Sequence, residues 1–408
     1  MSYGEKAHFM KHQALYPRWL CLLTLLFCLN GWAQHARPPS AKRPQLAMGA
    51  AFSPDGRLWI TGLTSSGQLY VRHTAFPGPV QFSDPAIIDT GSDEIAADGE
   101  NRPKIAFGPN GWAVISYTQP LAKPYTGNIR MLRSDDGGQT FSRPFTVHDD
   151  RQLITHRFES IAFDGQGRLF TLWIDKRDQP ITGSGSNYPG AALYQKVSHD
   201  GARTFGPDQK VADNSCECCR IALTTNTQGE MFGVWRHVFG QQTRDHAFVA
   251  LNGTPRPITR ASYDEWQINA CPHHGPGLAV ATPTEDAPAG FHLVWYGVRH
   301  QEGAARYARL GPTGEPLANT IRKLPDPQAE HADVLSHGPL VWIVWRSYAD
   351  GKTSLKTWRS TDGGTRFQLQ VLGQVSGYND HPRIAQLGDV MAIVWNTPER
   401  IHVYEVTP

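Results

Sequence analysis

The sequence predicts an all-β fold, a β-propeller, from a turn that occurs three times and an apolar strand that occurs seven times. The turn occupies residues 134–141 (SDDGGQTF), 198–205 (SHDGARTF) and 360–367 (STDGGTRF). The first two copies, which begin at Ser134 and Ser198, are about one repeat unit apart. The second and third, which begin at Ser198 and Ser360, are about three such units apart if each unit is slightly shorter. A unit of such a length, repeated along a chain, is typical of propellers and other repeat arrays.

The last residue of the apolar strand recurs at regular spacing along the sequence, and we call these equivalent positions a column. The column is Gly62, Tyr117, Trp173, Trp235, Trp295, Trp345 and Trp395, which follow one another at similar intervals. Short runs rich in Val, Ile, Phe and Trp between turn residues predict buried strands. The 39 Gly and 30 Pro residues argue against long helices. We therefore predict a propeller, seven-bladed by this count, with a six-bladed ring plus an accessory hairpin as the alternative. The last copy lacks a fourth strand, which the segment before Leu46 could supply.

Composition fits one domain, which we predict over residues 46–408. The formal net charge of +2 gives no reason to expect a nucleic-acid or anionic-membrane partner. We expect a monomer that takes a small-molecule or glycan ligand.

The N-terminal segment has the pattern of a signal peptide, predicted over residues 1–33. Lys6, Lys11 and Arg18 precede an apolar run at residues 19–29, and small residues follow near Ala33. The run is short for a bilayer span, although an uncleaved anchor is the alternative. We predict an exported protein, periplasmic or extracellular, with a disordered stretch at residues 34–45 and no transmembrane domain in the mature chain.

Four of the six cysteines lie outside the predicted signal peptide: Cys216, Cys218, Cys219 and Cys271. In an oxidising compartment an even number of cysteines favours disulfides. We predict at least one disulfide, between Cys271 and a member of the 216–219 group. The alternative is that the thiols bind copper or zinc together with histidines.

The position of these residues in the repeat predicts an axial site. Each copy has a first apolar residue in its inner strand, at Ile105, Ile161, Ile221, Leu278, Val334 and Ile384. Inner strands line the channel of a propeller, so the five residues before each should converge at one mouth of it. The candidate metal ligands found there are Cys216, Cys218, Cys219, Cys271, His273, His274, His331 and His381.

The recurring turn, S-x-D-x-G-x-T-F/W, resembles the Asp box (BNR repeat) of the sialidase-like β-propellers. The first copy matches it fully, the second has Ala202 where glycine is expected, and the third has Arg366 where threonine is expected. We expect Asp136, Asp200 and Asp362 to accept hydrogen bonds from the backbone of their own turns, a structural role.

The resemblance to sialidases also implies a catalytic set. An arginine cluster for a substrate carboxylate would use Arg102, Arg157, Arg220 and Arg383. Tyr378 would be the nucleophile, Glu159 or Glu330 its partner, and Asp380 the acid/base. The family's early FRIP-type motif is absent, and Tyr378 lies farther from the next strand than the family pattern requires, so we expect little or no cleavage of sialosides. In the alternative, these arginines pair with Asp333, Asp380 and Glu217.

Three functions remain open from the sequence. The first is an exported propeller that binds a small ligand or a transition metal, copper or zinc, at a Cys/His/Arg-rich axial site. The second is an exo-sialidase or related glycoside hydrolase acting on a carboxylated sugar. The third is a scaffold or adhesion propeller without chemistry, since the fold alone does not determine function.

Overall fold

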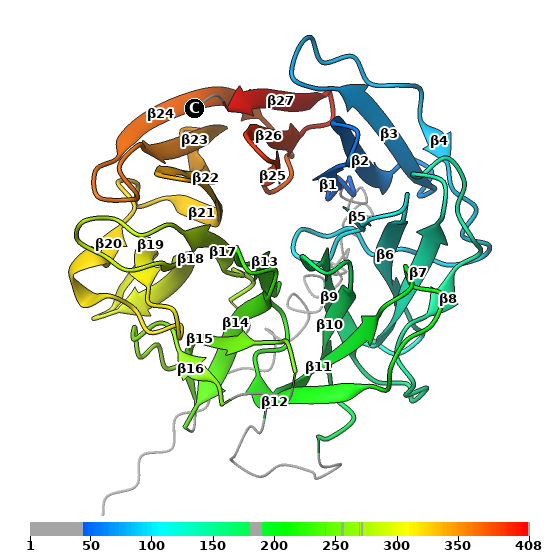
Figure 1. The fold of residues 1–408 in the computed structure, drawn as a ribbon, viewed down its shortest axis with the longest axis horizontal. Helices are drawn as coiled ribbons and strands as arrows, with labels where there is room; N and C mark the ends of the chain where they lie inside the picture. Colours follow the sequence, from blue (N-terminus) through cyan, green and yellow to red (C-terminus); the bar gives the residue numbers. More distant parts are fainter. Residues whose placement is uncertain are drawn as a thin grey trace, which may run out of the picture. The chain divides into compact units, whose positions relative to one another are not determined.

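The computed structural model describes residues 44–179, 190–240, 242–253, 257–268, 270 and 272–406. These residues form antiparallel strands arranged in a ring around a central channel (Figure 1). Their only helix is the short 3-10 turn η1 (Ala318–Thr320). The predicted signal peptide, residues 1–33, and most of the predicted disordered stretch lie outside the described residues. The prediction of an all-β propeller is confirmed.

The strands follow one another as seven meanders, groups of consecutive antiparallel strands, in the described part of the chain. The first two are β1 (Gly49–Phe52), β2 (Arg57–Leu63), β3 (Leu69–Ala75) and β4 (Ala86–Ile87), then β5 (Lys104–Phe107), β6 (Ala113–Pro120), β7 (Gly127–Ser134) and β8 (Phe145–Thr146). The next two are β9 (His156–Phe163), β10 (Leu169–Asp175), β11 (Ala191–Ser198) and β12 (Gln209–Ser215), then β13 (Ala222–Thr225), β14 (Met231–Phe239), β15 (Thr243–Ala250) and β16 (Thr259–Arg260).

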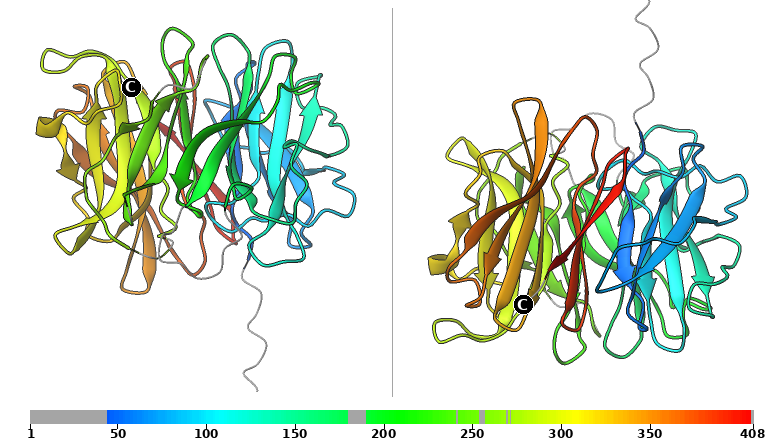
Figure 2. Two further views of the ribbon diagram at one scale, coloured as in Figure 1. Left: turned by 90° about the horizontal axis from the view of Figure 1, so that it is seen from below. Right: turned by 90° about the horizontal axis from the view of Figure 1, so that it is seen from above.

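The last three meanders complete the ring. They are β17 (Gly277–Ala281), β18 (Gly290–Arg299), β19 (Glu302–Leu310) and β20 (Arg322–Lys323), then β21 (Ala329–His337), β22 (Leu340–Ala349), β23 (Lys352–Ser360) and β24 (Gln368–Ser376), and finally β25 (Arg383–Leu387), β26 (Val390–Asn396) and β27 (Ile401–Val406). Seen from the side, the strands run between the two faces of the ring, so their connections lie on those faces (Figure 2).

Seven meanders nevertheless make six hydrogen-bonded sheets in the described part of the chain. The third and fourth meanders are joined into one eight-stranded sheet because β12 pairs with β14 at Ser215 and His237. The choice between six and seven blades therefore depends on whether this sheet is counted once or twice.

The predicted column of strand-end aromatic residues lies in the core. Trp173, Trp235, Trp345 and Trp395 are among the largest side chains that are less than 2% exposed. Each packs within a cluster of buried side chains from neighbouring meanders. Large aromatic side chains supply much of the apolar area that such a core buries, so the column holds adjacent meanders together.

The three Asp-box turns lie between the third and fourth strands of their meanders, and the predicted backbone hydrogen bonds are confirmed. The amide of Thr140 donates to Asp136 Oδ1 at 2.9 Å, and that of Thr204 donates to Asp200 Oδ1 at 2.9 Å. In the third turn the Arg366 amide donates to Asp362 Oδ1 at 2.8 Å. The Arg366 Nε atom also donates to Asp362 Oδ2 at 3.0 Å, the oxygen that the threonine hydroxyl contacts in the other turns.

The ring closes between β1 and β25, which pack against each other without sharing a sheet (Figure 1). Side chains of the last meander bind the backbone just before β1: Asn396 Nδ2 donates to the Leu46 carbonyl at 2.8 Å, and Asp380 Oδ2 accepts from the Met48 amide at 3.1 Å. The last sheet has three strands among the described residues. The segment predicted to add a fourth strand lies largely outside them.

Across the part of the chain that the structure describes, no helix has the length and apolar character needed to cross a membrane.

Candidate functional site

One position recurs in the segments that lead into six of the seven inner strands. It lies three positions before the first apolar residue of the inner strand, and we call this set the inner column: Arg102, Phe158, Cys218, Gly275, His331 and His381. All of them are buried, at 9% exposure or less where a value is given. The repeat register therefore buries charged, aromatic, thiol and imidazole side chains at equivalent positions of different meanders.

The backbone of two inner-column residues is adapted to this position. Phe158 and His331 have positive φ angles of 57° and 51°. The strand pairing shifts register beside each, between Leu172 and Ile174 and between Glu330 and Asp333. Positive φ in a non-glycine residue costs free energy, of the order of 1–3 kcal/mol, so tertiary contacts must hold both residues there.

A buried carboxylate is the centre of the site. Glu100 is 3% exposed, and its two carboxylate oxygens lie 3.1 and 3.2 Å from Arg220 Nη1. It also lies 3.0 Å from His331 Nδ1 and 3.8 Å from His381 Nδ1. We call Glu100, Arg220, His331 and His381 the axial group. It joins the second, fourth, sixth and seventh meanders across the channel.

Burial and charge fix the protonation of the axial group. Burial alone would raise the pKa of Glu100, but Arg220, His331 and His381 lower it well below its ordinary value. Burial lowers the pKa of His331, although Glu100 opposes the shift, and it lowers the pKa of His381 well below the usual range. Near neutral pH the carboxylate is therefore ionised and both imidazoles are neutral.

The imidazoles form a stack. His331 and His381 are parallel within 12°, with centroids 3.4 Å apart, and His274 stacks on His331 at 4.5 Å. Tyr296 continues the stack beyond His274 at 4.4 Å. Ligand atoms of Glu100, His331 and His381 lie within 4.8 Å of one another. Imidazole nitrogens bind a metal in the ring plane, so two parallel stacked rings cannot both direct a lone pair at one ion unless a ring turns.

A chain of polar contacts leads from the axial group to solvent. His331 Nε2 lies 3.9 Å from Glu330, whose side chain is 39% exposed. Glu330 accepts from Arg346 at 3.2 Å, and Arg346 Nη1 donates to the Asn379 carbonyl at 3.2 Å. Tyr378, beside Asn379, is 54% exposed. This side of the mouth therefore connects the buried pair of Glu100 and His331 to the surface.

Asp98 is carried by the same loop as Glu100. The Asp98 amide donates a hydrogen bond to the Asn101 carbonyl at 3.0 Å. Asp98 reaches solvent, yet burial raises the pKa of its carboxyl, and Arg157 and His273 oppose that shift electrostatically. A carboxyl with a raised pKa beside solvent is suited to donating a proton.

Three of the four predicted ligand-binding arginines contact protein carboxylates. Arg102 forms a bidentate pair with Asp380 at 2.9 and 3.0 Å, Arg220 contacts Glu100, and Arg383 lies 3.2 Å from Asp333. For Asp380 and Asp333, these contacts agree with the alternative prediction that the arginines pair with carboxylates of the protein. Glu217, however, pairs with Lys176 instead of an arginine.

Arg157 differs from the other three arginines. Its guanidinium lies over the Phe158 ring, 5.0 Å from the centroid, and among the described residues it forms no ion pair with a carboxylate. It is therefore the predicted arginine whose charge is available to a ligand.

The predicted catalytic residues are not assembled as a sialidase set. Glu159 is fully buried and accepts from Lys104 at 3.1 Å, Ser116 at 3.2 Å and Thr118 at 2.9 Å. Asp380 is held by Arg102, and Glu330 by Arg346. No described hydrogen bond joins Tyr378 to Glu159 or Glu330.

The cysteines gather in a separate place, which we call the sulfur cluster: Cys216, Cys218 and Cys219. The Cys218 sulfur lies 3.7 Å from that of Cys216 and 3.8 Å from that of Cys219. Both separations exceed the length of a disulfide bond. Cys271, and with it the predicted disulfide, lies outside the described residues. The predicted metal ligands thus divide into the sulfur cluster and the imidazole stack, with exposed His273 in neither.

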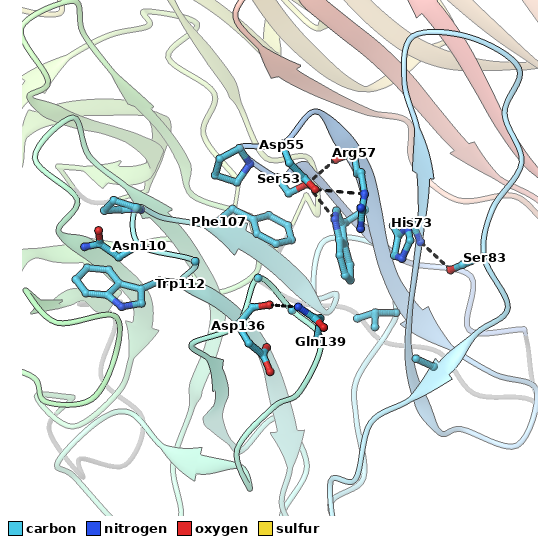
Figure 3. Close-up of a pocket in the computed structure, with 18 of the residues that line it drawn as sticks. Ser53, Asp55, Arg57, His73, Ser83, Phe107, Asn110, Trp112, Asp136 and Gln139 are labelled. Atoms are coloured by element: carbon cyan, nitrogen blue, oxygen red, sulfur yellow. Dashed lines mark hydrogen bonds and ion pairs between the residues drawn. The ribbon is translucent and has the colours of Figure 1, made fainter.

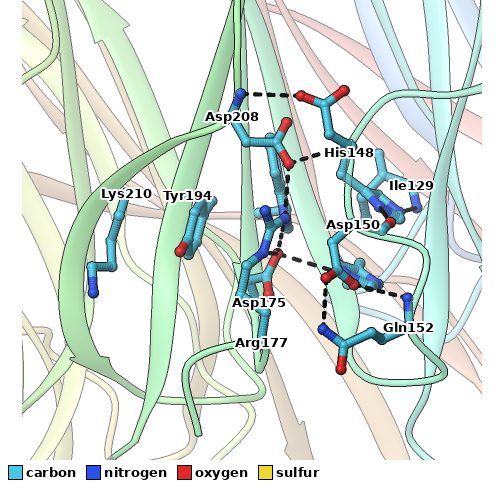
Figure 4. Close-up of polar contacts among 12 residues, drawn as sticks. Ile129, His148, Asp150, Gln152, Asp175, Arg177, Tyr194, Asp208 and Lys210 are labelled. Carbon is cyan, nitrogen blue, oxygen red and sulfur yellow. Dashed lines mark hydrogen bonds and ion pairs between the residues drawn. The ribbon is translucent and has the colours of Figure 1, made fainter.

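Sequence reasoning missed a polar network in the third meander (Figure 4). Asp175 accepts from Trp173 Nε1 at 2.7 Å and from Arg177 at 2.7 Å, and Arg177 also lies 2.9 Å from Asp208. His156 lies 3.1 Å from Asp150. The charges of these residues are paired within the network. The only signal in the sequence is the charged run after Trp173.

A cavity of about 730 Å³ lies over the outer turns of the first two meanders (Figure 3). Trp59, Phe107 and Trp112 line it together with the first Asp box. It contains none of the predicted axial residues.

Comparison with known proteins gives the fold but no family. No protein-family model matches the sequence, and a search of curated proteins finds no match. A polysaccharide lyase of family PL25, an ulvan lyase bound to a GlcA–Rha3S unit, aligns with 12% identity over 88% of this chain and 91% of its own, with a TM-score of 0.55. An α-L-arabinanase from Penicillium chrysogenum, complexed with arabinobiose, aligns with 13% identity over 82% of this chain and 95% of its own, with a TM-score of 0.50.

A Hadza microbial sialidase aligns with 12% identity over 84% of this chain and 74% of its own, with a TM-score of 0.49. At such identities a likeness shows architecture only. With its three Asp boxes and this ring of meanders, the chain has a sialidase-like β-propeller fold.

Proposed function

We propose that the mouth of the channel binds a carboxylated glycan and hydrolyses a glycosidic bond by acid–base catalysis. The observation that carries the proposal is the buried contact between Glu100 and His331 Nδ1 at 3.0 Å. A carboxylate behind an imidazole fixes the ring orientation and stabilises the imidazolium that forms when the ring takes up a proton.

In this proposal His331 is the base and Asp98 the acid. Neutral His331 accepts a proton at Nε2 from the water that attacks the anomeric carbon. Asp98, whose pKa is raised by burial, donates its proton to the leaving glycosidic oxygen. Arg157, which forms no ion pair with a described carboxylate, binds the carboxylate of the sugar.

The fold of glycan-active propellers supports the substrate class. The lyase and the arabinanase with the same architecture are described with bound GlcA–Rha3S and arabinobiose. Propellers place ligand-binding residues where the connections between strands converge at the channel mouth. Asp98 precedes the inner strand β5, and Arg157 and Glu330 are the second residues of the inner strands β9 and β21.

The test is cleavage of a panel of sialosides, glucuronides and uronate-containing oligosaccharides, followed by the appearance of new reducing ends. We expect turnover of at least one carboxylated substrate class. His331→Gln and Asp98→Asn should each lower kcat by about 10²-fold or more, the usual contribution of a positioned acid or base. Arg157→Met should mainly raise KM for the acidic substrate.

The matched control is His337→Gln. His337 lies on the same strand, β21, at its other end, and is 42% exposed. Circular dichroism should show the same fold in all variants. Full turnover in His331→Gln and Asp98→Asn, or neither binding nor cleavage of any carboxylated glycan, would refute the proposal.

A second candidate reaction is β-elimination from a uronic acid, favoured by the neutral state of the His331 imidazole. A neutral imidazole backed by a carboxylate can remove the proton next to the sugar carboxylate, and the glycosidic oxygen leaves with a proton from Asp98. The products distinguish the two reactions, since elimination leaves an unsaturated sugar that absorbs in the ultraviolet and hydrolysis does not.

A further inference from the structure

We propose that Cys216, Cys218 and Cys219 bind one thiophilic d¹⁰ cation, Cu(I) or Zn(II), in the connection between the third and fourth meanders. The site is distinct from the channel mouth and does not depend on the proposed reaction.

The spacing of the three sulfurs suits a single metal ion. Two edges of the sulfur triangle measure 3.7 and 3.8 Å, and the third is at most 4.8 Å. A point equidistant from the corners of such a triangle lies at most about 2.4 Å from each sulfur, and metal–thiolate bonds measure about 2.3 Å. An ion could therefore occupy the triangle with little movement of the backbone.

The chain presents these sulfurs from a fixed connection. The segment leaves β12 at Ser215, and the Cys216 amide donates to the Arg236 carbonyl on β14 at 2.9 Å. The exposures of Cys216, Cys218 and Cys219 are 1%, 4% and 2%. A short connection anchored to the next meander holds three thiols close together, and thiolates are the ligands that select Cu(I) and Zn(II).

The surroundings suit a charged thiolate site in a dry environment. Phe158, Leu172, Ile174 and Trp235 pack around the sulfurs and keep water out. Arg244 is 2% exposed, and its Nη1 atom lies 3.1 Å from Cys216 Sγ. Its Nε atom donates to the Ile268 carbonyl at 2.9 Å, which orients the guanidinium. A buried cation beside a thiolate offsets the negative charge of the metal–thiolate unit.

The metal would also support the axial group. Cys219 is followed directly by Arg220, whose side chain lies against Glu100, while the Cys219 side chain lies in the sulfur cluster. An ion bound by the sulfurs fixes the backbone from which Arg220 reaches the channel.

The test uses the full chain, purified with its thiols reduced under anaerobic conditions and loaded separately with Zn(II) and with Cu(I). After desalting, mass spectrometry of the elements gives the ratio of metal to protein, and X-ray absorption gives the ligand atoms. We expect one ion per chain with sulfur scatterers at about 2.3 Å. Replacing all three cysteines with serine should lower retention at least tenfold, whereas His381→Gln should leave the ratio at one.

Three outcomes would overturn the proposal. They are no retained metal in the reduced wild-type chain, a first shell of nitrogen and oxygen only, or a disulfide that includes any of the three cysteines in protein purified from its native compartment without reductant. The X-ray absorption measurement uses the metal-loaded wild-type chain and needs no substitution. The proposal therefore stays testable if the serine variant fails to fold. Loss of glycan cleavage in His331→Gln would leave the metal ratio unchanged, which separates this site from the proposed reaction.

Discussion

The inner column and the Asp-box turns belong to the same repeat, yet they are built in opposite ways. Each Asp-box turn keeps its serine, aspartate and phenylalanine and closes on itself, with its aspartate bonded to amides three or four residues on. The inner column carries different kinds of side chain from copy to copy, and the partners come from distant copies. Arg102 pairs with Asp380, 278 residues away, and the neighbouring Arg220 pairs with Glu100, 120 residues away.

The difference shows which part of a repeat can vary. A turn whose hydrogen bonds are local has few alternatives, because every bond depends on residues of that same turn. The inner column depends on ring closure, and only the complete set of meanders gives its charges their partners. This is why residues can differ from copy to copy at the inner column, where chemistry is expected, but hardly at the turns.

The strongest test of this contrast is Arg220→Met. It leaves Glu100 buried without its guanidinium, and breaking a buried pair by removing one partner costs about 3–5 kcal/mol. We therefore expect the free energy of unfolding in urea to fall by that amount. The double variant Glu100→Gln with Arg220→Met should recover most of it, since no unpaired charge remains buried. A loss of less than about 1 kcal/mol in the single variant would show that the inner column does not depend on its distant partners.

Acid should weaken the imidazole stack at His274, beside the inner-column residue Gly275, before it weakens the turns. Burial, followed by repulsion from His331, lowers the pKa of His274 from 6.5 to about 3. Between these two values the unfolded chain binds a proton at this imidazole and the folded chain does not, so stability falls as pH falls. The slope is about 1.4 kcal/mol per pH unit for one group. His274→Gln should remove this contribution to the slope of the free energy of unfolding against pH, measured by urea unfolding from pH 6.5 to 4.

The turns should respond only at lower pH. Hydrogen bonds from Thr140 lower the pKa of Asp136 to about 2 from 3.8, so its contribution is lost as pH falls below 3.8. The opposite result would be an unchanged pH dependence of the free energy of unfolding in His274→Gln together with a reduced one in Asp136→Asn above pH 4. It would show that the turn, and not His274, accounts for the loss of stability in this range.

Asp136→Ala is expected to cost about 1 kcal/mol, the net value of a hydrogen bond of this kind. The carboxylate bonds only within its own turn, so ligand binding at the channel mouth should not change. Thermal unfolding and glycan binding, measured on the same preparation, check both parts. Lost binding at unchanged stability would contradict a structural role.

The smallest effect is expected for Arg366→Thr. The arginine Nε atom occupies the place that a threonine hydroxyl takes in the other two turns, at 3.0 Å from Asp362, and its side chain is 89% exposed. Threonine restores the same bond, so stability should change by less than about 0.5 kcal/mol. A larger loss would mean that the third turn has contacts that the other two lack.

The sequence predicts the outer parts of this molecule better than the inner ones. The Asp boxes and the column ending in Trp173 and Trp395 are visible as spacing, because local turn chemistry and strand patterning are written in neighbouring residues. The convergence of His331 and His381 also follows from register. The partners do not: Glu100 stands first in its approach segment with no motif around it, and its contact with Arg220 exists only after ring closure.

The same limit separated the predicted ligands. The cysteines and histidines occupy equivalent positions of the repeat in the sequence. Equivalent positions predict at which level along the propeller axis a residue lies, but they do not predict where its side chain points. Cys219 and Arg220 are adjacent in the sequence. Residues 217–219 form a turn in the structure, so Cys219 lies in the sulfur cluster and Arg220 against Glu100, which no spacing in the sequence distinguishes.

Among the described residues, the seam between β1 and β25 joins two sheets through side chains and packing, with no strand shared across it. The order of the meanders around the ring is therefore independent of where the chain starts. A circular permutant that links residue 406 to residue 44 and opens the chain between β20 and β21 would keep every sheet intact. In such a molecule the contact between Asp380 and the Met48 amide would join two consecutive segments of the chain, and it would form early in folding instead of last.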